Sequence, residues 1–243
     1  RVDVDAAHRL DVDIDLAVRK ARLMAKGGLG APDRSLDLAL DVPSLADLLP
    51  PQSKAKVGGS VSLTGSARGD WTAPQFSLAL NGKALRWAGH ALAGIDAKAS
   101  YAGGADGAVQ VLAGASGYRN AAQPRAAVES ASLAVEGILS NHAIRLQTTA
   151  SRAHAALVLA DGGWRDDAWR GRIREATIGP PLELRLLAPT ALVAGPHGVE
   201  FGPAEIAVQH VRFDDIRFRS DDAGIATQGR FSGLQPIRLA VPV

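Results

Sequence analysis

The amino-acid sequence predicts an all-β fold, an elongated and mostly antiparallel sheet. Apolar and polar residues alternate with a period of two along many short segments, which is typical of strands with one apolar face. Turn-forming residues separate these segments, since Gly 26 and Pro 13 are spread along the 243 residues. The hydrophobic content of 47% includes 45 Ala but only 11 Phe, Trp or Tyr. Such small side chains are poorly suited to filling a dense core.

The first clear strand covers residues 10–18, where five apolar residues share one face and three Asp lie on the other. The same period recurs to the end of the chain and predicts roughly 13 to 15 strands. The later strands are centred on residues 36–42, 61–63, 76–80, 95–101, 109–111, 133–135, 144–146, 157–159, 182–186, 206–208, 211–213 and 237–241.

Turn signals join these strands. Asn81-Gly82 and Asp106-Gly107 predict tight hairpin turns, and Gly103-Gly104, Gly162-Gly163 and Pro180-Pro181 predict further interruptions. The connections therefore favour antiparallel meanders.

One short helix is expected over residues 43–50. Ser44 is a candidate N-cap with Asp47 three residues later, and Pro50 ends the segment. Residues 16–24 have some helical propensity, but their alternation should override it.

The chain reads as one architectural unit over residues 1–243, with a soft boundary near residues 117–125, where the alternation lapses. It begins Arg1-Val2-Asp3 without Met or an apolar leader, so we expect an internal fragment. No stretch approaches the ~18 apolar residues of a membrane span.

The formal net charge of +2 gives no reason to expect nucleic acid. The absence of Cys excludes disulfides, Cys-ligated metals and a Cys nucleophile.

Motifs for chemistry are missing. None of the six His lies in a zinc-binding spacing, and we expect no catalytic residues, no metal and no cofactor. Gly27 to Gly30 is interpreted as a flexible turn. The pairs Asp166-Asp167, Asp214-Asp215 and Asp221-Asp222 are interpreted as solvated turns.

Arg170, Arg172 and Arg174 share one strand face. A solvated outer face is the favoured interpretation, with contact to anionic headgroups as the alternative.

The apolar strand faces leave two possibilities. They cover one another in a sandwich or barrel core, or they stay partly open to acyl chains or to unfolded apolar polypeptide.

Two stretches resemble the TamB family of AsmA-like proteins. The first runs from Leu45-Ala46-Asp47-Leu48-Leu49-Pro50 through Gly59-Ser60-Val61-Ser62-Leu63-Thr64-Gly65 to the strand 76–85. The second comprises residues 137–146, Gly162-Gly163-Trp164, Trp169-Arg170-Gly171, Pro181-Leu182-Glu183-Leu184 and Pro189-Thr190-Ala191-Leu192. It resembles the region just before the family's C-terminal domain, and suggests an internal to C-terminal-proximal fragment.

The resemblance implies the periplasmic portion of an inner-membrane-anchored protein in a Gram-negative bacterium. The expected fold is a curved sheet forming a taco-like groove with an apolar interior. The implied function is phospholipid transport between the two membranes and support of outer-membrane protein and autotransporter assembly. The implied partners are phospholipid acyl chains, a TamA-like outer-membrane barrel and outer-membrane protein substrates. The alternative is chaperone-like binding of unfolded outer-membrane β-strands without lipid carriage.

Ten residues are the candidates for the groove wall: Leu36, Leu38, Leu40, Leu63, Leu78, Leu80, Leu133, Val135, Ile144 and Leu146.

Overall fold

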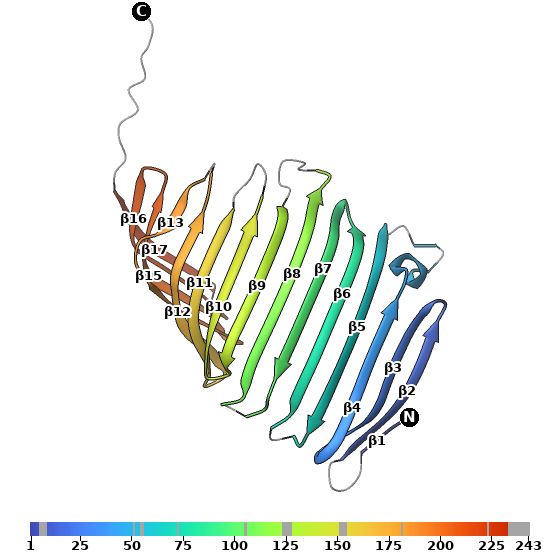
Figure 1. Ribbon diagram of the computed structural model, residues 1–243. Helices are drawn as coiled ribbons and strands as arrows, with labels where there is room; N and C mark the ends of the chain where they lie inside the picture. The colour runs from blue at the N-terminus through green and yellow to red at the C-terminus, as the bar shows by residue number, and fades with distance from the viewer. Residues whose placement is uncertain are drawn as a thin grey trace, which may run out of the picture.

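The computed structural model is a 17-stranded antiparallel sheet, and its described residues include a single short helix (Figure 1). The structure describes residues 1–4, 9–50, 52–53, 56–71, 73–104, 106–122, 128–150, 155–180, 182–222 and 224–232. Strands pair with their neighbours in chain order from β1 to β12. Strands β13 and β14 then share one place between β12 and β15. The predicted antiparallel all-β sheet is confirmed.

The strands are β1 (Val2–Val4), β2 (Leu10–Val18), β3 (Ala21–Leu29), β4 (Ala31–Val42), β5 (Val57–Gly69), β6 (Gln75–Trp87), β7 (His90–Tyr101), β8 (Ala108–Asn120), β9 (Val128–Ile138), β10 (Asn141–Thr149), β11 (Ala156–Arg165), β12 (Ala168–Ile178), β13 (Leu184–Leu186), β14 (Thr190–Gly195), β15 (Gly198–Val208), β16 (Val211–Asp221) and β17 (Gly224–Ser232). The helix is η1 (Leu45–Leu48).

The strands are more numerous than the 13 to 15 expected. Strands β1, β3, β12, β14 and β17 are not among those listed from the alternation in the sequence, because their apolar residues alternate less regularly. Residues 16–24 form the end of β2 and the start of β3, so alternation does override their helical propensity. The strand predicted at residues 237–241 lies outside the described residues.

The predicted helix is shorter and tighter than expected. It is one 3-10 turn of 4 residues, and Ser44 stands at its N-cap without a side-chain hydrogen bond to the helix. The capping interaction inferred from Ser44 and Asp47 is therefore not formed. A 3-10 turn of this length needs few caps, since it closes with the backbone bonds Asp47 N to Ser44 O and Leu49 N to Ala46 O.

Several of the predicted turns are wrong, because their residues lie inside strands. Asn81-Gly82 lies inside β6, and the chain reverses at Ala88 and Gly89, whose φ angles are 43° and 85°. A Cβ at Gly82 would lie 2.7 Å from Ile95 Cγ2. The glycine thus makes room for a side chain of the next strand and does not form a turn.

Gly162-Gly163 likewise lies inside β11. A Cβ at Gly163 would lie 2.0 Å from the carbonyl oxygen of Ser140, so this glycine allows close approach of the β9–β10 connection. The hairpin turn between β11 and β12 is Asp166-Asp167, with φ angles of 49° and 57°, as expected for a solvated turn.

Some of the other predicted turns lie between strands and others lie inside them. Gly103-Gly104 and Asp106-Gly107 lie between β7 and β8, and Pro180 lies between β12 and β13, as predicted; Pro181 is outside the described residues. Asp214-Asp215 lies inside β16, at a register shift and not in a turn. Gly27 and Gly28 belong to β3, and Gly30 lies between β3 and β4.

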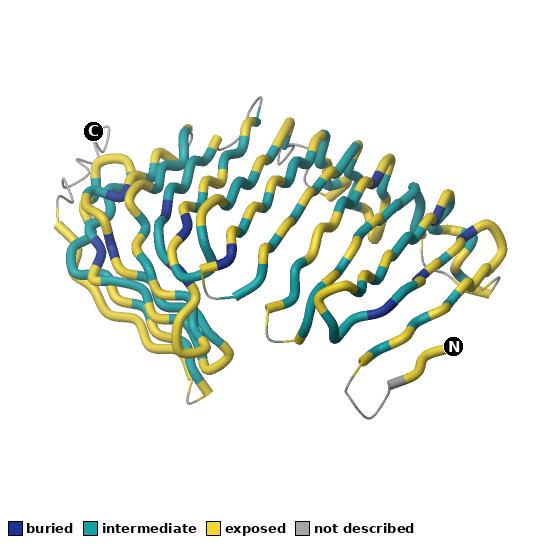
Figure 2. Tube along the Cα trace, turned by 60° about the horizontal axis from the view of Figure 1, so that its bottom comes forward, coloured by how far each residue is buried: buried dark blue, intermediate teal, exposed yellow. Residues whose placement is uncertain are grey.

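The sheet is bent, and it has no second layer among the described residues. Figure 2 shows both ends of the sheet curving toward the same side, so that the sheet forms an open trough. The accessible surface is 16127 Å², against roughly 10,300 Å² for a compact monomer of this mass. Among the described residues, no large side chain is fully buried. The alternative of a closed sandwich or barrel core is therefore excluded for this part of the chain.

The sheet continues through the region of the soft boundary. Strand β8 pairs with β9 from Ala108 opposite Ile138 to Tyr118 opposite Val128, while residues 123–125 lie outside the described residues. In the part of the chain that the structure describes, no helix has the length and apolar character needed to cross a membrane.

Gly163 provides a test of the close approach between β11 and the β9–β10 connection. We expect Gly163→Ala to lower the free energy of unfolding by about 1–3 kcal/mol, because backbone atoms of Ser140 occupy the position of the new methyl group. The control is Gly58→Ala in β5, where a Cβ meets nothing within 4 Å. Urea denaturation compares the two variants, and equal midpoints would contradict the close packing of Gly163 against Ser140.

Candidate functional site

The candidate site is the apolar face of the sheet, which the strand register assembles into two rows. Residues directly opposite each other on antiparallel strands point to the same face. Row 1 consists of Leu16, Leu23, Leu40, Leu63, Leu80, Ala97, Ala113, Leu133, Leu146, Val158 and Ala176. Row 2 consists of Ile14, Ala25, Leu38, Gly65, Leu78, Ala99, Val111, Val135, Ile144, Ala160 and Ile173.

The structure brings all ten predicted residues to this one face. Leu40, Leu63, Leu80, Leu133 and Leu146 belong to row 1, and Leu38, Leu78, Val135 and Ile144 belong to row 2. Leu36 lies two residues before Leu38 on β4 and opposite Ala67. Their shared face follows from the register, which sequence alternation within single strands could not supply.

The face is not covered by other described parts of the chain. Leu78 is 37% exposed and Leu146 is 39% exposed, and the other eight predicted residues are half-buried. Leucines in a closed core would be almost fully buried. The two rows therefore present a continuous apolar surface across β2 to β12.

The opposite face is polar. A neighbouring cross-strand series on that face contains Asp37, Ser66, Ser77, Ser100, Gln110 and Glu136. Ion pairs join strands there: Arg22 Nη2 lies 2.6 Å from Asp15 Oδ2, and Asp161 is 3.1 Å from Arg172 and 2.9 Å from Arg174. The arginines predicted to form a solvated outer face thus lie on the polar side of β12, where Arg172 and Arg174 share the single carboxylate of Asp161.

These ion pairs also shift protonation equilibria. The hydrogen bond from Arg22 lowers the pKa of the Asp15 carboxyl. At the other end of the sheet, hydrogen bonding by Arg217, with Arg230 nearby, lowers the pKa of Asp215. The Asp15 side chain is exposed and that of Asp215 is half-buried, and the arginine partner of each is exposed, so their pairs add little stability.

The middle of the apolar face is lined by small side chains. Strands β7 and β8 contribute Ala97 and Ala113 to row 1 and Ala99 and Val111 to row 2. Leucines and β-branched residues of β4 to β6 and of β9 and β10 stand on either side. Neither row contains an aromatic residue, so no large ring fills the space above the small side chains of β7 and β8.

Aromatic side chains occupy the strand ends instead. At one edge, the ring of His90 stacks between Trp87 and Tyr118, with centroid separations of 5.5 Å and 5.9 Å, and His90 Nδ1 lies 2.9 Å from the Tyr118 hydroxyl. At the other edge, Phe76 and Tyr101 lie 5.5 Å apart. Such rings combine an apolar body with a polar tip, which suits the boundary between an apolar surface and water.

His142 and Trp169 form a polar contact on the same side of the sheet as Phe76 and Tyr101. Trp169 Nε1–H donates to His142 Nε2 at 2.9 Å, so Nε2 carries no proton and the neutral ring donates from Nδ1 to the Ile138 carbonyl at 3.1 Å. His142 is 9% exposed.

The alternation pattern of the sequence gives no indication of this pair. The Trp169 ring reaches His142 across Gly162 and Gly171, where a Cβ would lie 2.7 Å and 2.5 Å from the ring. Glycines flanking a large aromatic residue in neighbouring strands were the signal that could have found it.

No metal site is evident in the described ranges, where no three His, Asp or Glu side chains gather closely enough to hold an ion. His8 and His154 lie outside them.

The comparison with protein families gives one match. Residues 1–197 match the family described as TamB, N-terminal domain. This agrees with the family suggested by the motifs, although the matched domain is the N-terminal one and not the region before the C-terminal domain. No curated protein and no solved structure showed significant similarity to the chain.

The openness of the apolar face can be tested by truncation. We expect Leu78→Ala to lower the free energy of unfolding by about 1 kcal/mol or less, below the roughly 2–5 kcal/mol typical of core leucines. The matched control is Leu186→Ala in β13, because Leu186 is 8% exposed and should cost more. Urea denaturation measures both, and a larger loss at Leu78 would mean that the face is covered in solution.

Proposed function

Since this chain belongs to the TamB family, we propose that it is a non-catalytic periplasmic segment whose apolar face holds phospholipid acyl chains during their transport between the inner and outer membranes. The observation that carries this proposal is the pair of apolar rows across β2 to β12. Neither row contains a charged or hydroxyl-bearing residue, and no described layer of protein covers them.

The energetics favour an apolar occupant. At ~25 cal/mol per Å² of apolar surface, covering about 400 Å² with an acyl chain is worth on the order of 10 kcal/mol before entropic losses. The strip of small side chains on β7 and β8 leaves room for such a chain. Water in contact with the same apolar surface provides no comparable favourable free energy.

The apolar face is proposed to line the inside of the trough. Ala25, Val42, Ala160 and Leu186 are buried, and their register partners are apolar-face residues. Burial on a face without a second layer is expected where side chains crowd together on the inner side of a bend. This supports a groove with an apolar interior.

The family membership supports a setting for this groove. We assign the chain to the periplasmic portion of an inner-membrane-anchored protein of a Gram-negative bacterium. The full-length protein would act with a TamA-like outer-membrane barrel and would support assembly of autotransporters and other outer-membrane proteins.

A second candidate is chaperone-like binding of unfolded outer-membrane β-strands. Strand β17 is exposed along all 9 residues, with Ile225 at 75% and Phe231 at 63%. Its outer edge pairs with no strand in the part of the chain that the structure describes. A free strand edge can take up an extended polypeptide through backbone hydrogen bonds.

The lipid proposal predicts a face-specific effect of charge. We expect Leu78→Glu and Leu133→Glu to reduce co-purifying phospholipid at least about tenfold while the fold survives, because a carboxylate is costly to bury against acyl chains. The control is Leu112→Glu: Leu112 is 42% exposed but lies on the opposite face, between Lys98 and Ala134. Mass spectrometry of retained lipid and a lipid-transfer assay provide the readouts. Unimpaired retention and passage in the first two variants would sink the proposal.

Site-directed photocrosslinking separates the two candidates. If acyl chains occupy the face, probes at Leu80 and Leu146 should give lipid adducts in cells. Probes at Ile225 or Phe231 on β17 should give polypeptide adducts if unfolded strands dock at the edge. Polypeptide adducts without any lipid adducts would favour the chaperone function.

A further inference from the structure

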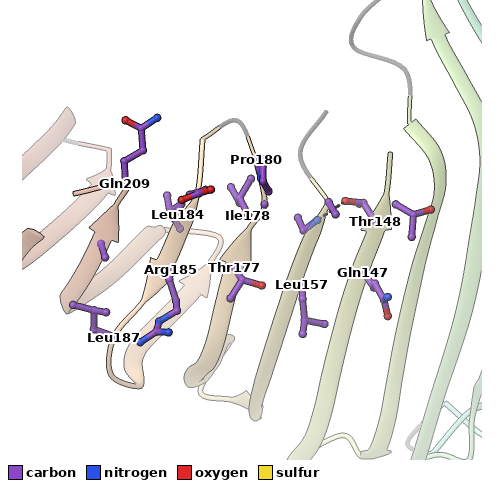
Figure 3. A pocket seen from close by; sticks show the side chains of 16 residues that line it. Gln147, Thr148, Leu157, Thr177, Ile178, Pro180, Leu184, Arg185, Leu187 and Gln209 are labelled. Atoms are coloured by element: carbon purple, nitrogen blue, oxygen red, sulfur yellow. Dashed lines mark hydrogen bonds between the residues drawn. The ribbon is translucent and has the colours of Figure 1, made fainter. Parts of the chain in front are cut away.

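An open cavity lies on the polar face near one edge of the sheet, where β10, β12 and β15 end and β11 and β13 begin. Its volume is about 680 Å³. Four of its lining residues form one cross-strand row, in which Gln147 is opposite Leu157, Leu157 opposite Thr177, and Thr177 opposite Arg185. Figure 3 shows these four side chains extending to the same side of their strands.

The cavity contains one cation and one anion that do not neutralise each other. Arg185 and Glu183 both line it, and both residues are exposed. Among the described residues, neither side chain lies within the 4.0 Å of a charged partner that defines an ion pair. Other arginines on this side of the sheet, such as Arg172 and Arg174, do have a carboxylate partner. The cavity therefore offers two opposite charges to a ligand.

Uncharged hydrogen-bonding groups surround these charges. Gln147 accepts a hydrogen bond from Arg145 at 3.0 Å through Oε1, which leaves its amide N–H groups as donors. The Thr177 hydroxyl can donate as well. An anionic oxygen near Arg185 would thus find further donors on β10 and β12.

The cavity is also continuous with the apolar face. Ile178 and Leu184 line it, and they are opposite each other in the register. Ile178 is also opposite Ala156 on β11, and Leu184 is also opposite Val208 on β15. In Figure 3 the side chains of Ile178 and Leu184 extend to the side opposite that of Thr177 and Arg185. A molecule at this edge can therefore contact the charges and the apolar face together.

We propose that this cavity binds a zwitterionic headgroup carrying one phosphate and one ammonium group. Arg185 pairs with the phosphate, which also accepts hydrogen bonds from Gln147 and Thr177, and Glu183 pairs with the ammonium group. A guanidinium suits phosphate oxygens, because it offers several donors in one plane. The inference rests on the proposed function in one respect: a lipid headgroup at this edge would leave its acyl chains on the apolar face.

Titrations with soluble probes test the site without acyl chains. Glycerophosphoethanolamine carries both charges, glycerol 3-phosphate only the anion, and ethanolamine only the cation. We expect glycerophosphoethanolamine to shift the amide NMR signals of Thr177 and Arg185 in the 243-residue chain and to bind more tightly than either single-charge probe. Because the chain-free probe does not need the apolar face, failure here is distinguishable from failure of acyl-chain binding.

Two variants and one control complete the test. Arg185→Gln and Glu183→Gln should each weaken binding of glycerophosphoethanolamine roughly two- to fivefold, the range of exposed ion pairs. Arg119→Gln on β8, outside this cavity, should leave it unchanged. Absence of binding, equal binding of glycerol 3-phosphate, or no effect of Glu183→Gln would each overturn the proposal.

The source of the headgroup is resolved by a short-chain lipid. Dihexanoylphosphatidylethanolamine below its micelle concentration should bind more tightly than glycerophosphoethanolamine, with both affinities reduced by Arg185→Gln. This result supports a lipid headgroup as the ligand. Equal affinities would support the same zwitterion site with a soluble ligand.

Discussion

The strand register is the constraint on which the rest of this molecule depends. Because side chains alternate along a strand, a register slip of one residue would move every apolar side chain to the polar face. From β2 to β10 the pairs that form rows 1 and 2 follow one another without such a slip. The register shifts in β4, β5 and β15 lie outside the two rows. The shift between Leu159 and Ala160 on β11 still leaves Val158 and Ala160 opposite apolar partners on β12.

This constraint gives a sheet held together by cross-strand contacts between neighbouring strands, since no large side chain is fully buried among the described residues. Adjacent strands satisfy each other's N–H and C=O groups, and side chains lean on cross-strand neighbours, as Leu78 leans on Gly65. The ion pairs of the polar face are exposed and contribute little each. The apolar face is consequently where further stabilisation is available, and any apolar ligand that binds the folded sheet supplies it by mass action.

The sequence predicted the parts that depend on local pattern. Alternation identified most of the strands and the apolar set from Leu36 to Leu146, because period two is a property of each strand. It could not predict the register by which apolar residues of neighbouring strands come to lie opposite each other. Nor could it predict that Asn81-Gly82 would continue β6, because Gly82 makes room for the side chain of Ile95 on β7. Gly162 and the contact between His142 and Trp169 were missed for the same reason: each depends on residues of other strands. Arg185 and Glu183 carried no signal, because their significance lies in a cavity that five strands form together.

The dimensions of the sheet suit a lipid whose headgroup lies in the proposed cavity and whose acyl chains lie on the apolar face. Half of a ~30 Å bilayer core corresponds to acyl chains about 15 Å long, and strands are spaced about 4.8 Å apart. A chain lying across the strands therefore covers about three intervals. With its headgroup near Arg185 on β13, it would run from Ile178 and Leu184 over Ala156 on β11 and end over Thr148 on β10 and Ala131 on β9. Leu146 and Leu133 lie two residues away along these two strands, opposite each other. The next strands, β8 and β7, carry the small side chains of Ala113 and Ala97. A lipid held at this edge would thus have its chain ends beside the strip of small side chains on β7 and β8. An acyl chain can move onto this strip without displacing a large side chain.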